Sequence, residues 1–101
     1  MDTHNFGSGE VPAHQHPNGG GWVADTANVA ITAYVGEQAK VFDHAEVYDQ
    51  AEVYDQAEVF DHAKVFGDAE VHHDAKVFGH AKVSGKAKVS GGAWVFDQAK
   101  V

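Results

Sequence analysis

Valine recurs at every sixth position of this chain, without exception, from Val23 to Val101. Alanine stands two residues before each valine, from Ala27 to Ala99. A six-residue period does not fit an α-helix, because at about 100° per residue the valines would spread around the helix and bury no common stripe. In a strand, alternate side chains share one side, so the alanine and valine of each repeat would point together. The pattern therefore predicts short strands with one apolar side.

The residues after each of these strands indicate a turn. They are rich in Asp, Gly, His and Gln, as at Asp43, Asp49 and Gly67. Asp and Gly tolerate the backbone angles of a sharp corner. One strand with its turn cannot bury its own alanine and valine, so successive units must stack as a solenoid.

A longer period of 18 residues indicates how many six-residue units make one coil. A 12-residue coil would align His44 with Gln56 and Asp68, whereas an 18-residue coil keeps like residues in columns. We therefore predict an all-β solenoid of about four triangular coils over residues 21–101, with three hexads per coil. The columns that define this period are Phe42, Phe60, Phe78 and Phe96, and His44, His62 and His80.

Residues 1–20 lie outside the repeat. They contain both prolines and end in "HPNGGG", which predicts an irregular arm or a cap. Such an arm would cover the open end of the first coil, where Val23 and backbone groups would otherwise be exposed. Val101 poses the same problem at the other end, which we expect a partner, a second copy or a continuation of the chain to cover.

The repeat resembles a known family. The stretches "VFDHAE" and "VSGKAK" follow the pattern V-x-x-x-A-x, which is similar to the hexapeptide repeat of left-handed parallel β-helix proteins, among them acyltransferases and γ-class carbonic anhydrases. This resemblance covers residues 21–101 and implies a left-handed coil and a parallel homotrimer. The opening "HPNGGGWVADTANV" is also similar to uncharacterised repeat proteins of bacteriophages and prophages, which implies a phage origin.

An outward aromatic strip is the first candidate site. In the predicted register the four phenylalanines of the 18-residue series face outward, with Trp22 and Trp94 beside them. A contiguous exposed aromatic strip usually marks an interface. The alternative is that each of these phenylalanine rings lies flat over the neighbouring coil and only shields the backbone.

A ligand site at the seams between protomers is the second candidate. His44, His62 and His80 form a corner column beside the aromatic strip, and Lys40 and Lys76 lie on the neighbouring face. Such histidines could bind a divalent metal and would repel one another once protonated. The alternative is a polar corner residue that is interchangeable with the glutamines of other turns.

His14 and His16 form a third candidate, a metal site. An H-x-H pair in an extended segment points both imidazoles to one side, and three copies around a threefold axis would supply six nitrogens to one ion. Phage puncturing spikes use such an arrangement, which this pair resembles. The alternative is a mobile or capping arm, and we expect no other cofactor.

Composition narrows the function. The net charge of −8 disfavours nucleic acid as a partner, and the absence of cysteine excludes disulfides and thiolate metal sites. No apolar run is long enough to span a membrane. We therefore expect a cytoplasmic protein, which would lie in the host cytoplasm if it is encoded by a phage. The coils carry no inserted loop with a catalytic histidine, and the chain contains no arginine, which departs from both enzyme families. We expect a non-catalytic, oligomeric binding or assembly module that inhibits a host factor or sequesters a small ligand. The alternatives are an acyltransferase-like or carbonic-anhydrase-like enzyme and a structural virion or spike component.

Overall fold

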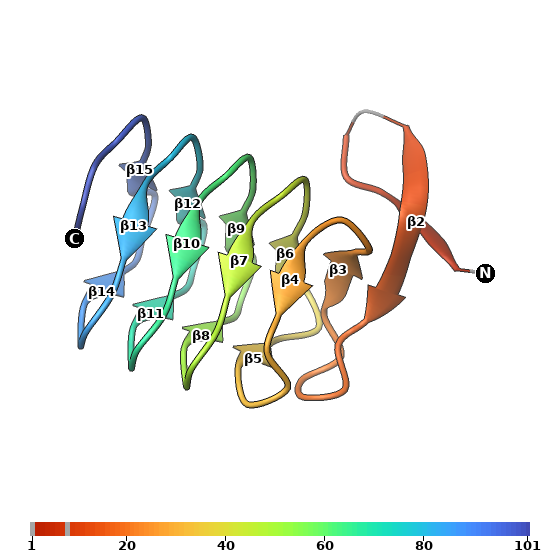
Figure 1. Cartoon of the computed structure of the whole chain (residues 1–101), viewed down its shortest axis with the longest axis horizontal. Helices are drawn as coiled ribbons and strands as arrows, with labels where there is room; N and C mark the ends of the chain where they lie inside the picture. Colours follow the sequence, from red (N-terminus) through yellow and green to blue (C-terminus); the bar gives the residue numbers. More distant parts are fainter. Residues whose placement is uncertain (1, 8) are drawn as a thin grey trace.

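The chain folds into a left-handed parallel β-helix. The computed structural model describes residues 2–7 and 9–101, so Met1 and Ser8 of the predicted arm lie outside the described residues. In Figure 1 the chain runs down the front of the prism and returns behind it while advancing from right to left, which is the left-handed sense. Four complete turns and the start of a fifth stack along the axis. This confirms the predicted fold class with three hexads per coil.

Three parallel sheets form the sides of the prism, and every third strand belongs to the same sheet (Figure 1). The first sheet contains β3 (Trp22–Ala24), β6 (Lys40–Val41), β9 (Glu58–Val59), β12 (Lys76–Val77) and β15 (Trp94–Val95). The second contains β4 (Asn28–Val29), β7 (Glu46–Val47), β10 (Lys64–Val65) and β13 (Lys82–Val83). The third contains β5 (Tyr34–Val35), β8 (Glu52–Val53), β11 (Glu70–Val71) and β14 (Lys88–Val89).

In every parallel strand pair the paired residues lie 18 positions apart, as Val41 and Val59 do. The interior consists of alanine and valine alone, and these residues are fully buried through the middle coils. Val29 of the first coil is only partly buried. No helix among the described residues has the length and apolar character that crossing a membrane requires.

The corners of the prism depend on one backbone conformation. Ten residues six positions apart, from Asp43 to Asp97, have φ between 57° and 70°. Glycine adopts this left-handed region freely, and aspartate tolerates it better than most residues. Aspartate also links coils here, because the Asp49 carboxylate accepts the backbone N–H of Gly67 at 3.2 Å. Three further pairs repeat this contact, namely Asp43 with Asp61, Asp55 with His73, and Asp61 with Gly79.

The first coil turns its corners differently. Asp25, Ile31 and Glu37 occupy its corner positions without a positive φ. In later coils, the backbone N–H of the residue after the corner donates to the carbonyl of the corner residue in the following coil, as His44 does to Asp61. At the first two corners the hydroxyl groups of Thr26 and Thr32 donate to that carbonyl instead. Threonine at these two positions therefore preserves the link between coils.

The N-terminal segment forms a cap that is more regular than the predicted irregular arm. Strands β1 (Thr3–Asn5) and β2 (Glu10–Gln15) make an antiparallel hairpin, and β2 pairs antiparallel with β3. The His4 ring stacks on Trp22 at 4.8 Å, so the hairpin also lies on the outer face of the first sheet. An edge strand exposes unpaired backbone groups, and β2 removes that exposure from β3.

The glycine-rich segment covers the third sheet at the same end. Val35 N–H donates to the Asn18 carbonyl, and Gly21 N–H donates to the Val35 carbonyl. This close approach requires glycine, since a Cβ at Gly19 or at Gly21 would lie 2.2 Å from a carbonyl oxygen of the first coil. The stretch "HPNGGG" is therefore the backbone that closes this end of the β5 sheet.

The dual role of the corner aspartates can be tested at Asp49. We expect Asp49→Ala to lower the free energy of unfolding by about 2 kcal/mol, because alanine is strained at this φ and lacks an acceptor for the Gly67 N–H. Asp49→Gly keeps the φ and loses only the acceptor, so its loss should be smaller. Asp49→Asn retains both properties and serves as the control. The stabilities of the three variants can be ranked by urea unfolding followed by circular dichroism. Equal losses of stability in the alanine and asparagine variants would contradict the prediction.

The cap should loosen in acid through His4. Burial lowers the pKa of His4 below its ordinary value of 6.5, and the charge of Lys40 lowers it further. Because the folded protein favours the neutral ring, this contribution to stability is present above pH 6.5 and is lost as the pH falls through the lowered pKa. We expect faster hydrogen exchange of β1 and β2 amides in acid. His4→Phe keeps a ring on Trp22 and should abolish that pH dependence.

Candidate functional site

The predicted aromatic strip is a stack of rings along one corner. Phe42, Phe60, Phe78 and Phe96 lie over one another with centroids 4.9, 5.0 and 5.4 Å apart. Phe6 of the cap adds a fifth ring, 4.8 Å from Phe42. The planes of neighbouring rings differ by 16° or less, so each ring covers the next. The flat arrangement considered from the sequence is thus the one observed, and an interface at the ring edges stays a prediction.

The two tryptophans differ in exposure. Trp22 is partly covered by the His4 ring. Trp94 is 60% exposed, contacts Phe78 edge-on at 5.8 Å, and has the Lys76 Nζ 5.6 Å from its ring centroid. The side chains that were predicted to form an interface therefore include one largely open ring, that of Trp94.

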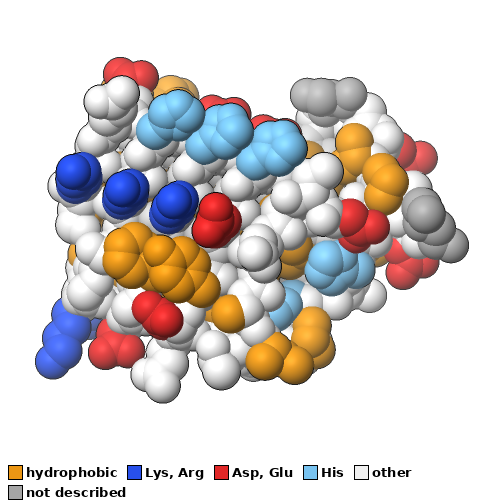
Figure 2. Space-filling model, viewed as in Figure 1, with side chains coloured by type: hydrophobic (Ala, Val, Ile, Leu, Met, Phe, Trp, Pro, Cys, Tyr) orange, Lys and Arg blue, Asp and Glu red, His pale blue; other side chains and the backbone are white. Residues whose placement is uncertain are grey.

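The predicted histidine and lysine positions lie in separate columns. His44, His62 and His80 are exposed at one corner, with ring centroids 5.3 and 5.1 Å apart. Lys40 and Lys76 are partly buried on the first sheet, on either side of Glu58 in the register. Figure 2 shows a row of histidines beside a row of lysines that ends at an acidic residue. That second row belongs to the second sheet and consists of Lys100, Lys82, Lys64 and Glu46.

His14 and His16 have separate partners within the chain. The His14 Nδ1 lies 2.7 Å from the Asp25 Oδ1. His16 is 3% exposed, and its Nε2 lies 2.8 Å from the Ala33 carbonyl oxygen. Both imidazoles thus help to fix the cap, and metal binding across three copies stays a prediction.

The three columns formed by the residue after each valine all begin with a small residue in the first coil. Ala24, Ala30 and Gly36 precede Phe42, Tyr48 and Tyr54, respectively, by 18 residues. In the first column, the Phe6 ring stacks on Phe42 beside the small residue. In the other two columns no described aromatic ring stacks on the tyrosine from the side of the first coil. These two places are open hollows in the surface.

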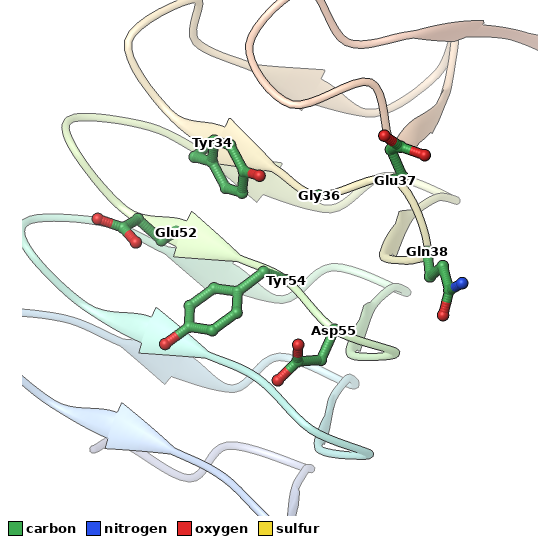
Figure 3. Close-up of a pocket in the computed structure, with 7 residues that line it drawn as sticks. All are labelled: Tyr34, Gly36, Glu37, Gln38, Glu52, Tyr54 and Asp55. Atoms are coloured by element: carbon green, nitrogen blue, oxygen red, sulfur yellow. The ribbon is translucent and has the colours of Figure 1, made fainter.

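The larger hollow lies at Gly36 and has a volume of about 560 Å³. We call it the Gly36 hollow, and Figure 3 shows Tyr34 and Gly36 on one coil and Tyr54 on the next. Three exposed carboxylates and no cationic side chain line it. Its residues are Tyr34, Gly36, Glu37, Gln38, Glu52, Tyr54 and Asp55.

Tyr54 is held firmly at this hollow. Its hydroxyl donates to the Glu70 Oε1 at 2.9 Å, and its ring stacks on His72 with centroids 4.9 Å apart. Burial raises the pKa of Tyr54 to about 12, and the hydrogen bond to Glu70 raises it as well. The phenol therefore stays neutral, with one ring face turned to His72 and the other toward the first coil.

Sequence reasoning missed the Gly36 hollow and the part played by Phe6. The signal was the change at the position after each valine, which is small in the first coil and aromatic in the second. Comparison of the chain with known protein families, with curated proteins and with solved structures finds no match.

Proposed function

We propose that the protein is a non-catalytic binding module that takes a guanidinium group, carried by an arginine of a partner protein, in the Gly36 hollow. The observation that supports this is the lining of the hollow, which combines two tyrosines with Glu37, Glu52 and Asp55. A cation over a tyrosine face is attracted by the ring quadrupole. Carboxylates on the rim add hydrogen bonds and opposite charge.

A planar group suits the space. The Phe6 ring demonstrates within this chain how a flat side chain stacks on an aromatic ring of the second coil beside a small residue of the first. Guanidinium is planar, stacks on aromatic faces and is more weakly hydrated than an ammonium group. Among the described residues no ring stacks on Tyr54 in the same position, and Gly36 has no side chain there.

Catalysis is less well supported than binding. His73 follows a strand of the third sheet, whereas His62 and His80 follow strands of the first, so His73 lies at a different corner from the other two. A carbonic-anhydrase-like set would therefore need a second subunit. The proposal of a binding module requires no such addition.

Self-association through the aromatic stack is a second candidate function. The stack of five rings runs along one corner, and Trp94 beside it is largely exposed. Three parallel copies that meet at this corner would form the trimer implied by the resemblance to hexapeptide proteins. A phage origin and a role in assembly belong to this second proposal.

Binding of a guanidinium group can be measured with argininamide. We expect saturable shifts of the Gly36 and Asp55 amide signals in NMR titration, and at least about tenfold weaker binding of citrullinamide, which has the same shape without the charge. Added salt should weaken the binding, since the rim carboxylates are exposed. Equal binding of the two amides would overturn the proposal.

Matched variants locate the site. Gly36→Phe should fill the hollow as Phe6 fills the first column, and argininamide binding should be lost. Ala30→Phe makes the same kind of change in the neighbouring column and should leave binding intact. If both variants bind equally well, the cation lies elsewhere on the acidic surface.

The assembly proposal predicts a trimer in solution. Trp94→Glu adds a charge to the most exposed ring without touching the buried valines, and we expect it to shift the mass in light scattering from trimer to monomer. Gln50→Glu, which adds the same charge at an exposed turn position of the second coil, is the control. A monomeric native protein would rule out this second function.

A further inference from the structure

One of the corners with a positive φ departs from the repeat. Nine of the ten corner residues with positive φ, from Asp43 to Asp97, are aspartate or glycine, and His73 is the exception, with φ of 61°. A positive φ strains the backbone of histidine more than that of glycine. The preceding residue is also a histidine, so the turn reads "HHD". Departures from an otherwise strict local rule are expected at functional positions.

The two histidines meet an aspartate of the coil before them. The His72 Nδ1 lies 2.6 Å from the His73 Nδ1, and the latter lies 3.6 Å from the Asp55 Oδ2. Each residue offers one ligand atom, and these atoms all lie within 4.8 Å of one another. Among residues 2–7 and 9–101, this is the one group of three or more His, Cys, Asp or Glu side chains with such spacing.

The cluster is positioned by the surrounding structure. The His72 ring stacks on Tyr54, whose hydroxyl is bonded to Glu70. Asp55 is held at its corner, because one carboxylate oxygen accepts the His73 N–H at 3.2 Å. The side chains of His73 and Asp55 are 64% and 50% exposed, so an ion could reach them from solvent.

The distances suit a transition metal. Zinc binds imidazole nitrogen at about 2.0–2.1 Å and carboxylate oxygen at about 2.0–2.2 Å, which places two tetrahedral ligands about 3.4 Å apart. The observed separations of 2.6 and 3.6 Å lie on either side of that value. Two nitrogens at 2.6 Å must share a hydrogen between them when no ion is bound, and an ion in the same place would satisfy both lone pairs.

We propose that Asp55, His72 and His73 form a binding site for a divalent transition metal of the zinc class. Two imidazoles and one carboxylate are ligands that such ions favour, and a three-ligand set leaves a coordination position open to solvent. The site is distinct from both metal sites predicted from the sequence. His14 pairs with Asp25, and no carboxylate pairs with the column of His44, His62 and His80 among the described residues.

The proposal can be tested by titrating the full, tag-free chain with zinc sulfate in a calorimeter. We expect one zinc per chain, and His73→Gly should weaken binding by more than about tenfold. Glycine occupies the same turn position at Gly67 and Gly79, so this variant should fold normally, as circular dichroism can verify. His62→Gln is the control, because glutamine occupies that position in other turns, and its affinity should match that of the native chain.

Each outcome decides the proposal. Loss of zinc binding in His73→Gly with retention in His62→Gln supports it. Native affinity in His73→Gly, loss in both variants, or no binding by the native chain overturns it. The proposal does not depend on guanidinium binding, since zinc is the only ligand used and Asp55 is intact in both variants.

Discussion

The hydrogen-bonded register between successive coils is the constraint on which the rest of the structure depends. Backbone N–H groups donate to carbonyls of the neighbouring coils, as Tyr48 does to Val65, and this pairing fixes a spacing of 18 residues. A slip by one residue would turn every buried valine outward, so the register is strongly specified. Once it is set, each outward side chain lies above an equivalent one, and stacked rings and linked corners follow.

Much of the fold can be read from the repeat because burial leaves so little choice. The narrow interior admits only alanine and valine, and the corners demand residues that tolerate a positive φ. Those requirements recur every six residues and therefore leave a periodic record. Phe42, Phe60 and Phe78 could be placed in one column for the same reason.

The parts that sequence reasoning could not supply depend on contacts outside the repeat. Phe6 joins the aromatic stack through the fold of the cap, and no period connects it with Phe42. The meeting of His72, His73 and Asp55 depends on side-chain orientation around a corner, which spacing alone does not determine. His14 pairs with Asp25 and His16 is buried against Ala33, and the H-x-H spacing alone predicts neither contact.

The small residues of the first coil have a consequence for stoichiometry. A solenoid can gain or lose whole coils without a change in how the remaining coils pack, because each contacts only its neighbours. Columns displayed along the prism would multiply with every added coil. The Gly36 hollow would not, because it exists only where a small residue meets the first aromatic ring of its column. Valency at this position is therefore independent of length, and a longer or shorter version of the chain would still present a single Gly36 hollow.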